Sequence, residues 1–142
     1  MTLDKILVRA IAVGLCLTAI LPLIVSSSLF FPFITGKAFF FRVVVEILLV
    51  GWSYLAWSDA RFRPKSSGIF WAVVALISVL TLATLFGADP GRSFWSNFER
   101  MEGLVTYLHL LAFFVVATTV LRERKNWNWI LHGSLLVNAI IG

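Results

Sequence analysis

The sequence has few charged residues. Asp, Glu, Lys and Arg make up only 13% of its 142 residues, whereas 60% are hydrophobic and the mean hydropathy is +0.94. An average soluble domain carries about 25% charged residues. A water-soluble domain of this length has too much surface to cover with so few charges. The composition therefore excludes a soluble enzyme and a disordered tail, and it indicates that the bilayer is the solvent.

Disulfides, metal-binding motifs and phosphate-binding loops are missing as well. The single cysteine, Cys16, cannot form a disulfide within the chain. The sequence has no glycine-rich phosphate loop, no Cys/His cluster with metal spacing and no nucleophile elbow. The net charge is +5, but the basic residues fall in short groups and not in one run or face. We therefore expect no cofactor, no metal and no nucleic-acid partner.

Long apolar runs separated by short polar connections predict an all-α, polytopic transmembrane helix bundle. A spanning helix needs roughly 20 apolar residues. The first run is longer than the apolar core of a signal peptide, so we expect an uncleaved span in which Pro22 is a tolerated kink. The predicted spans cover about residues 6–31, 38–57, 68–86 and 104–121, and the start of a fifth covers 130–142.

The fifth apolar run is too short to cross a bilayer. It offers 13 residues, from Ile130 to Gly142, where roughly 20 are needed. We therefore expect that residues 1–142 form the N-terminal transmembrane region of a larger membrane protein, or the product of a truncated reading frame. The remaining spans of the full-length protein are then partners of this region.

The distribution of basic residues predicts the orientation. Eight lie on the side of the N-terminus, namely Lys5, Arg9, Arg61, Arg63, Lys65, Arg122, Arg124 and Lys125. Four lie on the other side, namely Lys37, Arg42, Arg92 and Arg100. Loops rich in Lys and Arg stay in the cytoplasm. We therefore expect a multi-pass protein with a cytoplasmic N-terminus, whose connections around Gly36 and over residues 87–103 face the exterior.

The external connection over residues 87–103 is predicted to contain a short interfacial helix at about 90–102. Asp89 is a strong N-cap, and Pro90 suits the first helical position. One helical stripe then collects the large apolar side chains Phe94, Trp95, Phe98 and Met101. Gly103 lets the chain turn into the fourth span. A plain connector with an interfacial anchor is the alternative interpretation.

Two stretches of the chain resemble a known family. Residues 92–104, with the sequence RSFWSNFERMEGL, resemble a segment of bacterial O-antigen ligases and O-antigen polymerase-like membrane proteins. In many of those proteins an aromatic-rich segment that ends in Glu-Arg-x-x-Gly-Leu precedes a span. Residues 31–37, FPFITGK, followed by a Phe-rich helix with Arg42 and Glu46, are similar to the start of such proteins.

The resemblance implies a glycan transferase of the bacterial inner membrane. These families transfer or polymerise glycans carried on undecaprenyl pyrophosphate at the outer face of that membrane. It implies that an acceptor hydroxyl attacks the anomeric carbon and that the lipid pyrophosphate leaves. The family's catalytic His and Arg lie in a large external loop of the later half. We therefore assign no catalytic residue to residues 1–142, which alone should be inactive, and expect membrane lipids and the lipid-linked glycan donor as partners.

Two arginines of the external connection are candidate ligands of the lipid pyrophosphate. Arg100 and Arg92 are predicted at the depth of the headgroups, where such a group would lie. A guanidinium pairs bidentately with phosphate oxygens and stays charged. The alternative for Arg100 is an ion pair with Glu99, Glu102 or Asp89, or a side chain that extends to the interface.

Arg42 and Glu46 form a predicted polar pair within the second span. They lie one helical turn apart, so both can occupy one face of the helix. An ionised carboxylate in midspan costs about 2.5–3.5 kcal/mol, which makes function the default hypothesis. A pair that only stabilises helix packing is the alternative. His109 is expected to be structural. Two alternative functions belong to other classes. The chain is then a transporter or permease subunit with Glu46 in a proton or ion path, or a small structural membrane protein.

Overall fold

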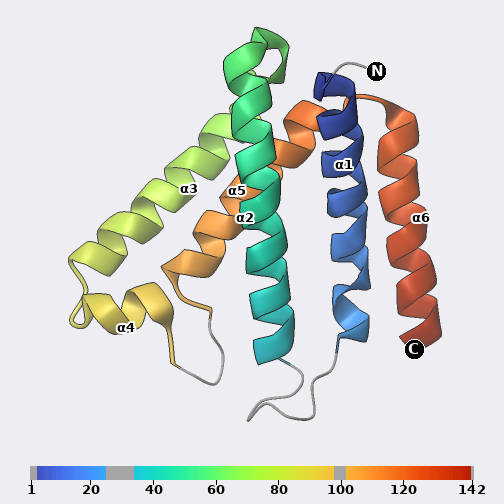
Figure 1. Ribbon diagram of the computed structural model, residues 1–142. Helices are drawn as coiled ribbons and strands as arrows, with labels where there is room; N and C mark the ends of the chain where they lie inside the picture. The colour runs from blue at the N-terminus through green and yellow to red at the C-terminus, as the bar shows by residue number, and fades with distance from the viewer. Residues whose placement is uncertain (1–2, 25–33, 98–101, 142) are drawn as a thin grey trace.

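The structure is a computed structural model that describes residues 3–24, 34–97 and 102–141 (Figure 1). All regular secondary structure in these ranges is helical. The elements are α1 (Leu3–Leu17), the 3-10 helix η1 (Thr18–Leu23), α2 (Thr35–Ser58), the 3-10 turn η2 (Ala60–Phe62), α3 (Gly68–Leu85), α4 (Pro90–Trp95), α5 (Leu104–Val120) and α6 (Arg124–Ile141).

Three helical segments are long and apolar enough to cross a membrane. They are Leu3–Leu23, Thr35–Ser58 and Gly68–Leu85, and they overlap the first three predicted spans. α5 is apolar but has only 17 residues, so the fourth span stays a prediction. The last helix begins at Arg124, before the expected start at 130. The end of the first predicted span, residues 25–31, lies outside the described residues.

Pro22 changes the type of helix in the first span. α1 ends at Leu17 and continues as the 3-10 helix η1, which contains Pro22. Proline has no N–H to donate and its ring crowds the carbonyl one turn earlier, so a regular α-helix cannot pass through it unchanged. The hydroxyl of Thr18 donates to the Leu15 carbonyl at 2.7 Å, where the helix type changes. The predicted kink is therefore a tightening of the helix.

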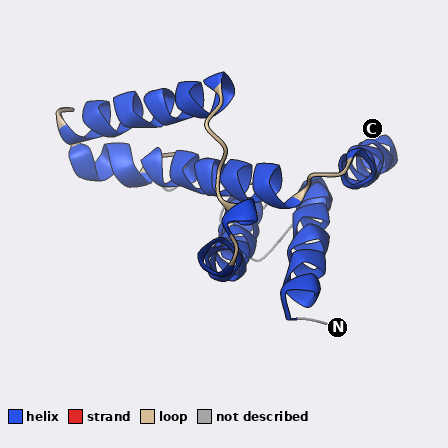
Figure 2. Cartoon of the chain, turned by 90° about the horizontal axis from the view of Figure 1, so that it is seen from above, coloured by secondary structure: helices blue, strands red, loops and turns tan. Residues whose placement is uncertain are grey.

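α2 lies at the centre of the arrangement. α1 packs against one side of it, and α5 crosses another side (Figure 1). α6 packs against α1 and η1, whereas α3 packs along α5. Figure 2 shows that α3 and α5 lie side by side and extend away from α1 and α2. The helices therefore diverge from a shared contact and do not form one set of parallel rods.

The tightest packing lies where α1, α2 and α5 meet. The buried cluster there consists of Ile11, Leu15, Leu48, Leu55, Val116, Ala117, Val120 and Leu121. Gly14 permits this contact, because a Cβ at that position would lie 2.5 Å from Cδ2 of Leu48. Small residues allow helices to approach closely in a membrane, where close packing replaces the hydrophobic effect as the driving force.

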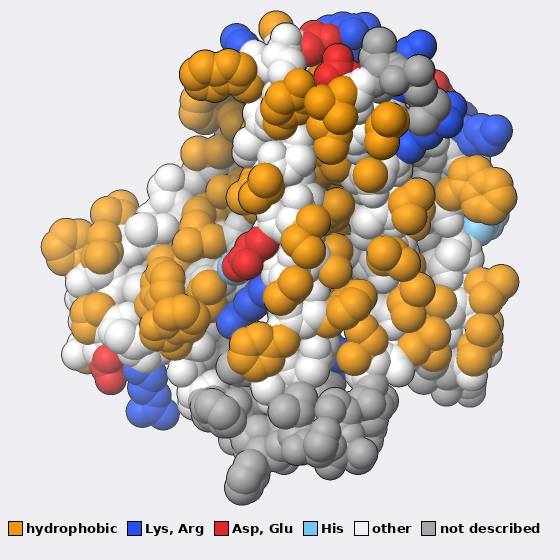
Figure 3. Space-filling model, in the orientation of Figure 1, with side chains coloured by type: hydrophobic (Ala, Val, Ile, Leu, Met, Phe, Trp, Pro, Cys, Tyr) orange, Lys and Arg blue, Asp and Glu red, His pale blue; other side chains and the backbone are white. Residues whose placement is uncertain are grey.

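Large hydrophobic side chains remain exposed along the flanks. Val50, Ile69 and Phe86 are 73%, 70% and 85% exposed. Figure 3 shows these flanks as hydrophobic, with charged side chains concentrated at the end near the N-terminus. Apolar flanks of this extent are rare on soluble monomers. They are compatible with a protein whose helices face lipid.

Candidate functional site

The connection that contains α4 begins as the sequence predicted. Oδ1 of Asp89 accepts a hydrogen bond from the backbone N–H of Arg92 at 2.9 Å, and Pro90 occupies the first turn. The Asp89 carbonyl accepts from the N–H of Ser93, also at 2.9 Å. Side-chain capping satisfies an N–H that has no partner within the helix. The predicted N-cap is confirmed.

The predicted length of this helix is wrong. α4 ends at Trp95, and Ser96 has φ 66° and ψ −177°, a conformation that ends a helix and that residues with a Cβ rarely adopt. One continuous helix over 90–102 is therefore not formed. The predicted apolar stripe ends with Phe94 and Trp95, and its other two members, Phe98 and Met101, lie outside the described residues.

Gly103 explains why the chain turns back after α4. A Cβ on Gly103 would lie 2.6 Å from the backbone nitrogen of Ser96 and still closer to the carbonyl oxygen of Phe94. Real Cβ atoms do not approach backbone this closely, so only glycine fits. The sequence predicted Gly103 as the turn into the next helix, whereas the structure adds that it lies directly against the end of α4.

The candidate pyrophosphate ligands are only partly placed by the structure. Arg92 lies in the last turn of α4 and is exposed, and its guanidinium makes no recorded polar contact with a described residue. Beside it, Trp95 is 60% exposed and its ring meets the edge of Phe94 at a centroid distance of 5.1 Å. Arg100 lies outside the described residues, so its pairing with phosphate stays a prediction.

A second group of polar side chains joins α2 to α5. Arg42 is buried, at 7% exposure, and its Nη2 donates to Oγ1 of Thr106 at 2.9 Å. One turn further along α2, Oε1 of Glu46 lies 3.1 Å from Nε2 of His109. We call Arg42, Glu46, Thr106 and His109 the α2–α5 polar cluster. In Figure 3 a small group of acidic, basic and histidine atoms lies midway along a largely hydrophobic face.

Both ring nitrogens of His109 have a polar neighbour. Nδ1 lies 2.6 Å from the carbonyl oxygen of Val105, which can only accept, so this contact is a hydrogen bond when Nδ1 carries the hydrogen. Nε2 lies 3.1 Å from Oε1 of Glu46 on the other helix. The His109 ring therefore links its own helix backbone to the Glu46 carboxyl of α2.

The predicted Arg42–Glu46 pair is only part of this cluster. The two opposite charges lie close enough to interact, but each side chain also contacts α5. Sequence reasoning did not pair Thr106 and His109 with α2; its expectation that His109 is a structural residue stays a prediction. The spacing of these polar residues was a usable signal. Arg42 and Glu46 lie four residues apart on one predicted span, and Thr106 and His109 lie three apart on another, so the two pairs can face each other.

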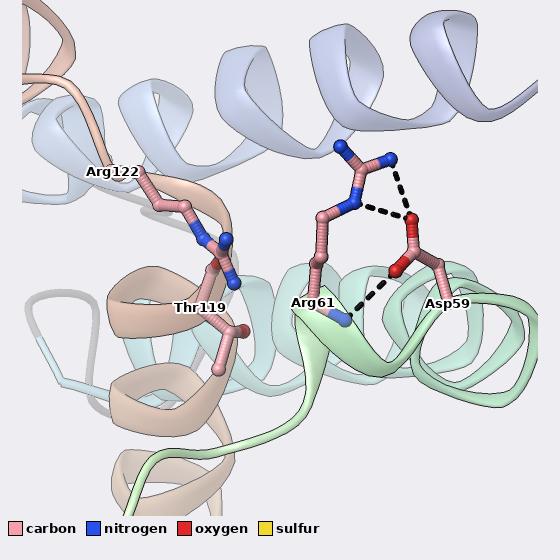
Figure 4. Close-up of polar contacts among 4 residues, drawn as sticks. All are labelled: Asp59, Arg61, Thr119 and Arg122. Carbon is pink, nitrogen blue, oxygen red and sulfur yellow. Dashed lines mark hydrogen bonds and ion pairs between the residues drawn. The ribbon is translucent and has the colours of Figure 1, made fainter.

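The opposite end of the molecule holds a third polar region. Figure 4 shows that Asp59 and Arg61 turn toward each other, while Arg122 folds back over the end of α5 beside Thr119. Arg61 Nε and Nη2 lie 2.7 and 2.6 Å from Oδ2 of Asp59. The side-chain and backbone hydrogen bonds from Arg61 lower the pKa of Asp59 below its ordinary value. Asp59 is therefore ionised at neutral pH and forms an ion pair with Arg61.

No protein-family model, curated protein or solved structure matches this chain. In the part of the chain that the structure describes, no three His, Cys, Asp or Glu side chains lie together in a way that could hold a metal ion. The side chains on which a functional assignment can draw are the arginines, the Glu46–His109 pair and the exposed aromatic rings.

Gly103→Ala should separate α4 from α5. The added methyl group would overlap backbone atoms of Phe94 and Ser96, so the end of α4 must move. We expect amide hydrogen exchange at Ser93 and Ser96 to accelerate at least about tenfold, because exchange reports local opening. Gly68→Ala is the matched control, since a Cβ there meets nothing within 4 Å. Unchanged exchange in Gly103→Ala would contradict the close contact.

The Glu46–His109 contact should appear as an energetic coupling between α2 and α5. Glu46→Leu and His109→Leu each leave one polar side chain without its partner, whereas the double variant removes both. Polar contacts between helices in membranes contribute roughly 0.6–1.7 kcal/mol, and we expect a coupling free energy in this range for unfolding in bicelles.

Ser53→Ala provides the control for this cycle, because the Ser53 hydroxyl bonds to the Leu49 carbonyl of its own helix. It should show no coupling to His109→Leu. Strict additivity of Glu46→Leu and His109→Leu would mean that the contact adds nothing to stability.

Proposed function

We propose that this chain is the N-terminal membrane part of a glycan transferase of the O-antigen ligase or polymerase type. The full-length protein would act on glycans linked to undecaprenyl pyrophosphate at the outer face of a bacterial inner membrane, with the N-terminus of this chain in the cytoplasm. The resemblance of residues 92–104 to a segment of those families carries the proposal. Apolar helices that suit a membrane are compatible with it.

The geometry around α4 supports a role in substrate binding. Gly103, the glycine of the Glu-Arg-x-x-Gly-Leu pattern, lies directly against the backbone at the end of α4. This contact holds the exposed Arg92 and Trp95 at one end of the molecule, opposite the basic turn of Arg61 (Figure 1). A cation and an indole ring at such an end suit the interface between headgroups and hydrocarbon. Arg100 follows in the same connection.

In the proposed reaction this chain binds the donor and does not perform the chemistry. The acceptor hydroxyl attacks the anomeric carbon, and the lipid pyrophosphate leaves with the bonding electrons. Arg92 and Arg100 would pair with its oxygens, where negative charge develops as the bond breaks. The base that takes the acceptor's proton belongs to the later part of the full-length protein. Residues 1–142 alone are therefore inactive as a transferase.

A proton-coupled transporter or permease subunit is the second candidate function. The observation that favours it is the 3.1 Å contact between two ionisable side chains, Glu46 on α2 and His109 on α5. The Glu46 side chain is 66% exposed and that of His109 is 14% exposed, so the carboxyl can be reached from outside the helix pair. Ionisable residues within a membrane commonly mark proton relays. The positive charge of Arg42 interacts with the Glu46 carboxyl.

Binding of a fluorescent undecaprenyl pyrophosphate analogue to the chain in nanodiscs tests the proposal. We expect Arg92→Gln combined with Arg100→Gln to weaken binding at least about tenfold, because each charge-assisted bond to phosphate contributes roughly 1.5–3 kcal/mol. Arg124→Gln, at the other end of the molecule, is the control and should bind as the unmodified chain does.

Equal binding by the double variant and the unmodified chain would remove the pyrophosphate role. Proton flux in proteoliposomes that disappears in Glu46→Gln, together with unchanged lipid binding, would favour the transporter instead.

A further inference from the structure

A cavity of about 490 Å³ lies where the turn after η2 meets the end of α5. Such a volume is within the usual range of about 300–1,000 Å³ for small-ligand sites. Its basic lining comes from two segments that are far apart in the sequence, with Arg63 and Lys65 on one side and Arg122 on the other. Among the residues that the structure describes, no acidic side chain lines it. The cavity therefore concentrates positive charge with no counterion in its own wall.

The nearby acids do not neutralise this cavity. The Asp59 carboxylate is already paired with Arg61, whose side chain and backbone N–H both donate hydrogen bonds to it. Glu123 does not line it but lines a second cavity, to which Arg61 and Arg122 also contribute. The charge of Arg122 is felt by Asp59, but no ion pair between them is recorded. An anion that enters the cavity would therefore meet three cations without displacing an existing ion pair.

The two arginines are held in place while their outer nitrogens remain available. Nε of Arg63 donates to the Ala56 carbonyl at 3.0 Å, and Nε of Arg122 donates to the Thr119 carbonyl at 3.1 Å. The Arg122 guanidinium also lies 5.7 Å from the centre of the Phe62 ring. No hydrogen bond is recorded from the Nη atoms of Arg63 or Arg122 to a described residue. Fixed guanidinium groups of this kind lose little entropy when they bind phosphate oxygens.

The rest of the wall combines the hydroxyl side chains of Ser67, Thr118 and Thr119 with apolar side chains of α3 and α5. Ile69 and Phe70 of α3 and Phe114 of α5 line it. An acyl chain could extend along this wall from a phosphate held among the cations, whereas a soluble phosphate would use the cations alone. Basic pockets between membrane helices are known to hold anionic lipid headgroups. The combination favours a lipid over a free anion.

We propose that this cavity binds the phosphate of an anionic phospholipid through Arg63, Lys65 and Arg122, with an acyl chain against Ile69, Phe70 and Phe114. The site lies at the opposite end of the molecule from α4 (Figure 1). It does not rest on the proposed transferase function. A bound lipid would link η2 and α3 to the end of α5, because its phosphate contacts side chains from both sides of the cavity.

Lipid binding to the purified 142-residue chain in phosphatidylcholine nanodiscs, titrated with phosphatidylglycerol, tests this site. We expect Arg63→Gln combined with Arg122→Gln to weaken binding at least about tenfold. Each cation near an anionic lipid surface contributes roughly fivefold in affinity, and the variant removes two. The matched control is Arg124→Gln combined with Lys125→Gln, which removes two basic residues of the next segment that do not line the cavity. It should change binding less than about threefold.

Lys65→Gln is a second variant for the case that the double variant unfolds because it loses the Nε hydrogen bonds of Arg63 and Arg122. Lys65 makes no recorded hydrogen bond or ion pair with a described residue, so its removal leaves the fold intact, and we expect roughly fivefold weaker binding. Equal losses in the cavity and control variants would overturn the proposal, because they would show only a general attraction of basic residues to anionic lipid. Binding of soluble glycerol phosphate as tight as that of phosphatidylglycerol would overturn the lipid assignment.

Discussion

The arrangement of this chain depends on the polar contacts between α2 and α5. Arg42 and Glu46 lie on α2, a helix long and apolar enough to cross a membrane, and in hydrocarbon such side chains are costly without partners. Both find partners on α5, through Thr106 and His109. These bonds account for the crossing of α2 and α5, on which the positions of α3 and α4 depend in turn.

Hydrophobic packing and polar contacts act at different places along the same helix pair. The buried cluster around Leu55 and Val116 holds the end of α5 against α2 and α1. The α2–α5 polar cluster lies closer to the start of both helices. A bilayer gives apolar contacts little advantage over contacts with lipid, so directional bonds fix the relative position of the helices there. The candidate donor-binding residue Arg92 lies on α4, which packs beside α5.

The sequence predicted the elements better than their contacts. Hydropathy located the first three spans, and the Asp89–Pro90 pair located the start of α4, because both signals are local. The extension of α4 to residue 102 was wrong. Apolar spacing cannot report that Gly103 returns to the backbone of Phe94 or that Ser96 adopts a positive φ. Those features arise only when two segments meet.

The same distinction applies to the candidate site. A midspan carboxylate could be recognised in the sequence, since its cost depends on depth alone, whereas its partner was indicated only by the matching spacing of polar residues on another span. His109 is 63 residues from Glu46, and their contact follows from a helix crossing that one sequence does not encode locally. The cavity of Arg63, Lys65 and Arg122 was likewise visible in the sequence only as separate basic loops.

Solid-state NMR on the labelled chain in lipid bilayers tests the central contact most directly. A dipolar correlation between the Glu46 carboxyl carbon and Nε2 of His109 should be observed, with Nδ1 carrying a hydrogen bonded to the Val105 carbonyl. A His109 ring that shows no correlation with Glu46, or whose Nδ1 carries no hydrogen, would contradict the account of how α2 and α5 are joined.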